Sequence, residues 1–284
     1  MPQKMMIMTP ATKSLVRSAL AEDICSGDIT TQACVEASAQ GRAILKTKQD
    51  LVLCGMDVVT EVLQQVDAEI LLRRSYSDGE HISAGTVFAD LRGKLASLLQ
   101  AERTLLNFLQ HLSGIATLTQ QYAQALQGSS ARLLDTRKTM PGLRELEKYA
   151  VKTGGGNNHR FGLYDRYLIK ENHIAASGSL ENALHKAKAH RGSKNLLIEI
   201  EVQNLAQAEL AVSFGTDIIM CDNMSPALVK EVVQKVEGRA KIEVSGNINL
   251  KNIKEYAFAG VDFISVGSIT HSAPAADVSM LIEA

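Results

Sequence analysis

From residue 132 onward, short apolar segments alternate regularly with helical segments of about ten to fifteen residues. This alternation is typical of parallel strands joined by helices, so it predicts an α/β fold. Six strands are expected, which is fewer than the eight of a complete β/α barrel. We therefore expect a reduced or partly open barrel, although a doubly wound sheet has the same local pattern. The expected strands cover residues 132–135, 167–170, 196–202, 217–221, 241–244 and 263–266.

The helices expected between these strands each carry an apolar stripe, and several of them stop at a glycine that can adopt the left-handed cap conformation. The first hundred or so residues lack this regular alternation and contain short β-like segments at 42–47 and 87–91, so we expect an α+β arrangement there. A long helical stretch at 97–127, interrupted at Ser113 and Gly114, is expected to join the two halves. The other expected helices cover 143–152, 180–190, 205–214, 226–236 and 250–259.

Composition limits the classes of function. The chain has 284 residues, enough for two domains or for one barrel with an appendage. Its formal net charge is −1, so nothing in the overall balance favours binding to nucleic acid or to a membrane surface. The four cysteines have no CxxC spacing, and no apolar segment approaches the roughly 20 residues of a membrane span. We expect a soluble cytoplasmic protein with reduced thiols.

Polar residues follow nearly every expected strand. In a β/α barrel the carboxyl ends of the strands and the loops after them form the active site, so these residues should share one cavity. In the segment 197–202 two glutamates alternate with branched apolar residues, which directs both carboxylates to the barrel interior. The residues at the six strand ends are Asp135 to Thr139, Lys170, Glu199 with Glu201, Asp222, Glu243 with Ser245, and, as the one end without a polar side chain, Gly267.

A cluster of cations falls within a short span and predicts an anionic ligand. Arginine offers a planar fork that matches a carboxylate or a phosphate, whereas lysine acts as a mobile point charge, so a mixed set suits a substrate with several anionic groups. Glu201 and Asp222 would suit Mg²⁺, which prefers oxygen ligands and often accompanies phosphates. Small residues at Ser245–Gly246 and Gly267–Ser268 predict a phosphate cradle. The cations are Arg137, Lys138, Arg144, His159, Arg160 and Lys170.

Several of these residues also have simpler interpretations. Lys170 could be a paired core lysine or a Schiff-base nucleophile of an aldolase. His159 and His271 could be structural histidines. Glu199 and Glu243 could pair with interior cations, so we rank them below Glu201 and Asp222 as functional groups. A binding module without catalysis is a further alternative, but so many interior charges without a ligand would cost stability.

Together these residues carry a resemblance to a known family. The segments DTRKTMPGLR at 135–144, EKYAVK at 147–152 and GGGNNHRFGLYD at 154–165 closely resemble quinolinate phosphoribosyltransferase. The resemblance extends over nearly the whole chain in order. Further matching segments are ED at 22–23, GDIT at 27–30, ERTLLNFLQ at 102–110, LIKENHI at 168–174, IEV at 200–202, CDNM at 221–224, EVSG at 243–246, SVG at 265–267 and THS at 270–272.

The resemblance implies an N-terminal α/β sandwich domain over residues 1–112, joined by the C-terminal segment 275–284, and a reduced barrel of six or seven strands over 113–274. It implies transfer of a phosphoribosyl group from phosphoribosyl pyrophosphate to quinolinate with Mg²⁺, with release of pyrophosphate and carbon dioxide, in NAD biosynthesis. It also implies a homodimer, or a hexamer built from such dimers, in which subunits share their active sites.

The resemblance assigns roles to individual residues. Quinolinate is expected to meet Arg137, Lys138, His159, Arg160 and Lys170, together with Arg103 from the neighbouring subunit. Glu201 and Asp222 are expected near the ribose and the metal, and Ser245, Gly246 and Gly267 near the 5′-phosphate. The residues expected to take part in catalysis are Lys138, Lys170, Glu201 and Asp222.

The chain departs from the family pattern at three positions. Relatives often have threonine at the place of Met140, aspartate at the place of Glu171 and glycine at the place of Asn247. None of these changes removes a charge from the expected site, but Asn247 alters the phosphate loop. Rival functions are a related pyrophosphorylase-like protein of molybdenum transport, a nicotinate-specific transferase and a Schiff-base barrel aldolase.

Overall fold

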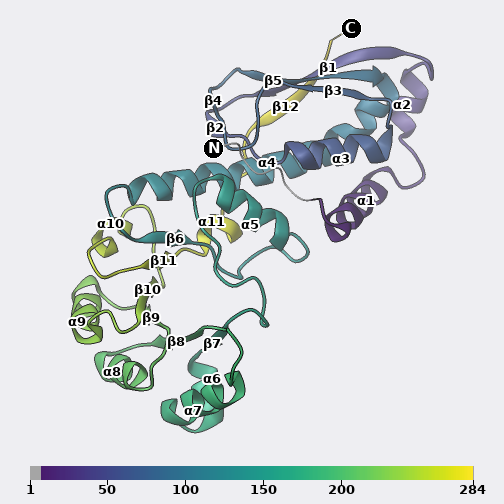
Figure 1. Ribbon diagram of the computed structural model, residues 1–284. Helices are drawn as coiled ribbons and strands as arrows, with labels where there is room; N and C mark the ends of the chain where they lie inside the picture. Colours follow the sequence, from purple (N-terminus) through teal and green to yellow (C-terminus); the bar gives the residue numbers. More distant parts are fainter. Residues whose placement is uncertain (1–7, 284) are drawn as a thin grey trace. The chain divides into compact units, whose positions relative to one another are not determined.

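The computed structural model describes residues 8–283 (Figure 1). Contacts between residues divide the chain into two compact units. The first unit contains the chain up to Gln120, the segment Met140–Gly155 and the chain from Ser272 onward, and the second contains Gln121–Thr139 and Gly156–His271. The sequence-based domain limits at residues 112 and 274 stay a prediction.

The first unit contains a four-stranded antiparallel sheet in the order β12-β1-β5-β3. Strand β12 (Val278–Glu283) comes from the end of the chain and pairs with β1 (Gln40–Thr47), so the C-terminal segment is part of this unit. The sheet also contains β5 (Val87–Lys94) and β3 (Leu71–Arg74), and a separate pair joins β2 (Leu51–Val52) and β4 (His81–Ile82). The helices of this unit are α1 (Pro10–Ile24), α2 (Ile29–Cys34), α3 (Met56–Val66), most of α4 (Leu95–Ala125) and α5 (Arg144–Thr153).

The long helix α4 corrects the expected interruption at Ser113 and Gly114, because it runs without a break from Leu95 to Ala125. Both residues serve packing contacts instead. The Ser113 hydroxyl accepts a hydrogen bond from the Cys54 backbone N–H at 3.0 Å and donates to the Cys54 carbonyl at 3.1 Å. A Cβ atom at position 114 would lie 2.1 Å from the Pro274 carbonyl oxygen, so glycine is required for this close approach.

The second unit contains a six-stranded sheet in the order β6-β11-β10-β9-β8-β7, and all neighbouring strands are parallel. All six expected strands are present, each within two residues of its predicted limits. Among the described strands the order ends at β6 and β7, which makes this an open, curved sheet and not a closed ring (Figure 1). The strands are β6 (Arg132–Leu134), β7 (Tyr167–Ile169), β8 (Ile198–Val202), β9 (Ile218–Asp222), β10 (Lys241–Ser245) and β11 (Phe263–Ser265).

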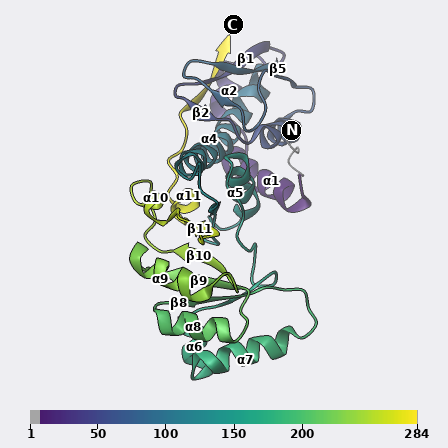
Figure 2. The ribbon, with the colours of Figure 1, turned by 60° about the vertical axis from the view of Figure 1, so that its left-hand side comes forward.

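Helices α7, α8 and α9 cover one face of this sheet (Figure 2). This arrangement is that of a reduced barrel, whereas a doubly wound sheet would carry helices on both faces. The expected helix at 250–259 is only one turn long, at α10 (Ile253–Tyr256), and a short helix, α6 (Glu171–Ser177), starts directly after β7. The remaining helices are α7 (Leu180–Arg191), α8 (Leu205–Ser213), α9 (Pro226–Val236) and α11 (Ser268–His271).

The sheet is buried because its strands carry branched apolar residues toward the helices. In β8, Ile198, Ile200 and Val202 are almost completely buried. Glu199 and Glu201, at the alternate positions, face the concave side, as the sequence pattern predicts. Among residues 8–283, no helix combines the length and the apolar character of a membrane-crossing segment.

Candidate active site

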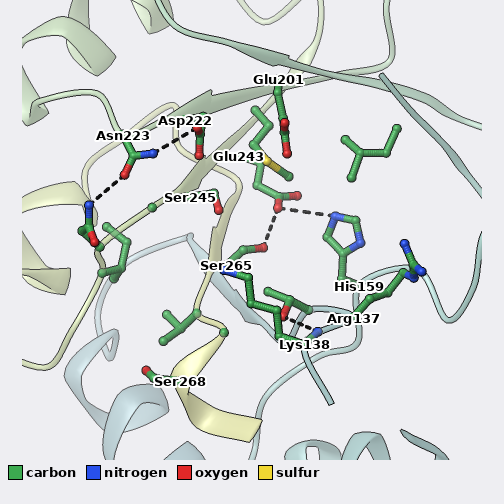
Figure 3. Close-up of a pocket in the computed structure, with 18 of the residues that line it drawn as sticks. Arg137, Lys138, His159, Glu201, Asp222, Asn223, Glu243, Ser245, Ser265 and Ser268 are labelled. Carbon is green, nitrogen blue, oxygen red and sulfur yellow. Dashed lines mark hydrogen bonds and ion pairs between the residues drawn. The ribbon is translucent and has the colours of Figure 1, made fainter. Parts of the chain in front are cut away.

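The carboxyl ends of the six parallel strands surround one cavity of about 1060 Å³ (Figure 3). Ligand pockets commonly range from roughly 300 to 1,000 Å³, so this cavity has room for a nucleotide-sized ligand. Its lining comes entirely from the second compact unit. Ten residues expected from the sequence line it: Arg137, Lys138, His159, Arg160, Lys170, Glu201, Asp222, Ser245, Gly246 and Gly267.

One side of the cavity carries the cations. Asp135, buried at the end of β6, accepts a hydrogen bond from the His159 backbone N–H at 2.8 Å, which holds the loop before Arg160 against the sheet. Arg160 is almost fully buried, and its NH1 donates to the Arg166 carbonyl at 3.1 Å. Burial lowers the pKa of Arg160, and the positive charge of Arg137 lowers it further. The guanidinium groups of Arg137 and Arg160 are therefore neighbouring positive charges, and an anionic ligand beside them would be stabilised by both.

The opposite side of the cavity carries the acids. Glu201 is paired with Lys170, whose ammonium donates to the Glu201 carboxylate. Asp222 ends β9 and accepts from the side-chain amide of Asn223 at 3.0 Å, and Asn223 in turn accepts from Asn247 at 2.9 Å. The loops after β9 and β10 are therefore tied together beside the carboxylate (Figure 3).

Two glycines shape the neighbouring loops. Gly246 has φ +98°, and a Cβ there would lie 2.3 Å from Oδ1 of Asn223. Gly267 follows β11, and a Cβ there would lie 3.1 Å from the Lys138 side chain and 3.3 Å from His271 Nε2. Asn247, where relatives often have glycine, has φ +54°. Asparagine tolerates this left-handed region better than most residues, so the turn is kept.

A buried layer of polar groups lies beneath the cations. His159 Nε2 is 3.2 Å from Glu199 Oε1 and 3.5 Å from Glu243 Oε1, and Glu243 also accepts from the Ser265 hydroxyl (Figure 3). Burial raises the pKa of Glu243 well above its ordinary range, and the charge of Glu199 adds to this. Burial alone would raise the pKa of Glu199 too, but the hydrogen bond from His159 and the charge of Arg166 outweigh it and lower the pKa.

Two sets of residues offer metal ligands. Oxygen donors at Glu201 and Asp222 face the cavity and suit Mg²⁺. His159, Glu199 and Glu243 place their ligand atoms within 4.8 Å of one another. Arg166 NH1, however, lies 3.0 Å from Glu199 Oε2 and would stand beside any bound cation. We interpret this buried set as a hydrogen-bonded cluster.

Two of the expected cations do not line the cavity, and several residues of the site were not expected from the sequence. Arg103 is exposed on α4 in the first unit, and Arg144 begins α5 in the same unit; neither is among the described residues that line the cavity. Sequence reasoning did not single out Arg166, Asn223 or Ser265. A polar residue next to a strand end was the available signal for Asn223 and Ser265. His271, for which no role was chosen, also lines the cavity.

Comparisons with known proteins agree over most of the chain. The family profile described as "Quinolinate phosphoribosyl transferase, N-terminal domain" matches residues 28–113, and the profile of the C-terminal domain of the same family matches residues 115–281. Together the two profiles cover most of the sequence.

Individual relatives give the same result. The chain is 40% identical to the probable nicotinate-nucleotide pyrophosphorylase [carboxylating] of Bacillus subtilis, over 94% of this chain and 92% of that protein. It is 40% identical to the nicotinate-nucleotide pyrophosphorylase [carboxylating] of Mycobacterium leprae, over 95% and 96% of the two chains. The structure of the nicotinate-nucleotide pyrophosphorylase from Francisella tularensis is similar with a TM-score of 0.91 and 42% identity, over 99% and 100% of the two chains. The chain therefore belongs to the quinolinate phosphoribosyl transferase family.

Proposed function

We propose that this enzyme transfers the phosphoribosyl group of phosphoribosyl pyrophosphate to quinolinate, with decarboxylation, to give nicotinate mononucleotide, pyrophosphate and carbon dioxide. One observation carries the proposal: a single cavity holds Arg137, Lys138 and the buried Arg160 on one side and carboxylates with small-residue loops on the other. A substrate with two carboxylates and a substrate with a sugar and phosphates can then meet in it. Membership of the family supports the same reaction in NAD biosynthesis.

The cation side is the proposed quinolinate site. Arg137 and Arg160 offer the planar forks that match the two carboxylates of quinolinate, and Lys138 adds a mobile charge. We further propose that the enzyme is a homodimer, or a hexamer built from such dimers, and that Arg103 of the partner subunit completes this side. Its exposed position on α4 leaves it accessible to such a partner.

The other side is the proposed site of the ribose donor. Backbone amides near Ser245, Gly246 and Gly267 would hold the 5′-phosphate, because loops after the last strands of β/α barrels commonly bind phosphate. Glu201 and Asp222 would lie near the ribose and would hold Mg²⁺. When bound, Mg²⁺ supplies positive charge that neutralises the pyrophosphate oxygens.

The proposed chemistry needs positioning and charge more than covalent catalysis. The pyridine nitrogen forms a bond to C1′ while the bond from C1′ to the pyrophosphate oxygen breaks, and pyrophosphate leaves with the electron pair. C1′ gains positive charge in this step, which the carboxylates of Glu201 and Asp222 stabilise. Lys170 and Lys138 hold the negative charge of the substrates.

Decarboxylation follows from the product of the first step. The ribosylated ring nitrogen is cationic, so the bond between C2 and its carboxylate can break with its electrons left on C2. A proton from solvent then completes nicotinate mononucleotide. Free cysteines at all four positions suit work in a reducing cytoplasm.

The experiment that tests this proposal supplies the purified protein with phosphoribosyl pyrophosphate, Mg²⁺ and quinolinate labelled in its 2-carboxylate. We expect equal amounts of labelled carbon dioxide and nicotinate mononucleotide. Nicotinate has no 2-carboxylate and serves as the matched control substrate. Faster product formation from nicotinate than from quinolinate would contradict the proposal.

A further inference from the structure

A closed ring of contacts joins Glu199, His159 and Arg166 to Arg160 on the cation side. Glu199 Oε1 lies 3.2 Å from His159 Nε2, and Glu199 Oε2 accepts from Arg166 NH1 at 3.0 Å. His159 Nδ1 accepts from the backbone N–H of Arg160 at 2.7 Å. The Arg160 guanidinium closes the ring by donating from NH1 to the Arg166 carbonyl at 3.1 Å. Glu199 thus holds the two residues that contact Arg160.

The hydrogen bonds determine which nitrogen of His159 carries the proton. Nδ1 accepts a backbone N–H and therefore has no hydrogen of its own, so we assign the imidazole proton to Nε2. Nε2 then donates toward the carboxylate of Glu199. The Nε2–H of this tautomer is directed at Glu199. His159 therefore connects Glu199 to the backbone of Arg160.

Depth in the barrel separates Glu199 from its neighbour Glu201. Both side chains lie on the same face of β8, but Glu199 has no exposed surface, whereas Glu201 is partly exposed and lines the cavity. Side chains inside a β/α barrel stack in layers, so Glu199 belongs to the layer beneath the ligand. It is too deep to meet the substrate itself and acts only through the groups it holds.

Arg160 is the group at the top of the ring that faces the cavity. Only 7% of its surface is exposed, and its Nε donor has no hydrogen-bond partner among the described residues. A buried donor without an acceptor is costly unless a ligand supplies one. The position of this guanidinium consequently matters for an anion that approaches from the cavity.

We propose that Glu199 is a positioning residue that acts through His159 and Arg166 to hold the Arg160 guanidinium in place for a carboxylate of quinolinate. This inference rests on the proposed function. It predicts that loss of Glu199 weakens quinolinate binding and leaves the ribose donor almost unaffected, because the donor is expected at the other side of the cavity.

The test combines Glu199→Gln with Arg160→Lys in a double-mutant cycle. Quinolinate binding is followed by titration calorimetry without the second substrate, and KM is measured for both substrates. We expect Glu199→Gln to raise the Kd and KM for quinolinate about tenfold, with the KM for phosphoribosyl pyrophosphate changed less than twofold. In the Arg160→Lys background, Glu199→Gln should change the Kd and KM for quinolinate less than twofold. Full additivity of the two substitutions would overturn the proposal.

Asp217→Asn is the matched control for a general loss of stability. Asp217 directly precedes β9, accepts from Arg191 at 2.8 Å and from the Ile198 backbone at 2.7 Å, and is outside the cavity lining. We expect it to leave the quinolinate Kd unchanged even where its melting temperature falls as far as that of Glu199→Gln. An equal rise in Kd in this variant would show that Glu199 acts through stability alone, which overturns the proposal.

His159→Asn tests the ring from a second member, in case Glu199→Gln fails to fold. The asparagine carbonyl can still accept from the Arg160 backbone, but the contact with Glu199 is lost. A several-fold rise in the quinolinate Kd supports the proposal, and an unchanged Kd overturns it. Wild-type protein that does not bind quinolinate at all would instead overturn the proposed function, and the inference with it.

Discussion

The two ends of the same parallel strands differ in how their charges are used. At the carboxyl ends, cations and acids face a shared cavity, and Glu201 and Asp222 contact polar partners at its surface. At the amino ends, Asp217 and Asp262 each accept from a backbone N–H in the first two residues of the neighbouring strand and pair with a cation. Charged groups at the amino ends therefore connect neighbouring strands, whereas charged groups at the carboxyl ends are available to bind a ligand.

The largest effect should come from Arg137→Ala, at the carboxyl end of β6. Removal of one partner of a desolvated charge pair typically costs about 2–5 kcal/mol, so we expect the KM for quinolinate to rise about 100-fold. Steady-state kinetics with each substrate varied in turn checks this. An unchanged KM for quinolinate would remove Arg137 from the proposed binding site.

Asp222→Asn should have the next largest effect, and on a different kinetic constant. We expect kcat to fall about 10- to 100-fold because the charge that stabilises C1′ in the transition state is lost. The KM for quinolinate should stay within about twofold, since Asp222 lies on the acid side of the cavity. A large change in that KM with an unchanged kcat would contradict the division of the cavity into two sides.

Mixed dimers test whether the cation side is complete in one chain. Arg103→Ala and Lys170→Ala should each abolish most activity. If Arg103 comes from the partner subunit, unfolding and refolding the two variants together should restore about a quarter of wild-type activity, because half of the dimers are hybrids and each hybrid has one intact site. No restoration would indicate that each chain supplies its whole site.

The smallest effect is expected at the amino ends, from Asp262→Asn. Lys241 pairs with Asp262 at 2.8 Å, but its side chain is 64% exposed, so the ion pair contributes little. We expect the free energy of unfolding to fall by less than about 1 kcal/mol, with both KM values unchanged. Denaturant unfolding and kinetics check the two statements, and a changed KM would weaken the contrast between the two ends.

Much of the second unit could be predicted because its signals are local. The alternation of apolar and polar residues in β8 indicated a strand with two inward glutamates, and the structure has both. The interruption expected at Gly114 was wrong because the reason for that glycine is Pro274, far along the chain. Arg166 was not predicted as a site residue for a similar reason, because its partner Glu199 lies 33 residues away in the sequence.

The order of residues alone fixed the type and sequence of the strands, and it placed charges at strand ends, because periodicity and turn residues act over a few neighbours. Which charge meets which partner, and at what depth, depended on folding. His159 lies 40 residues from Glu199 in the chain, and only their contact inside the barrel makes this histidine a hydrogen-bond partner of a buried carboxylate. Burial and hydrogen bonding are properties of an environment assembled from distant segments, so no local pattern contains them.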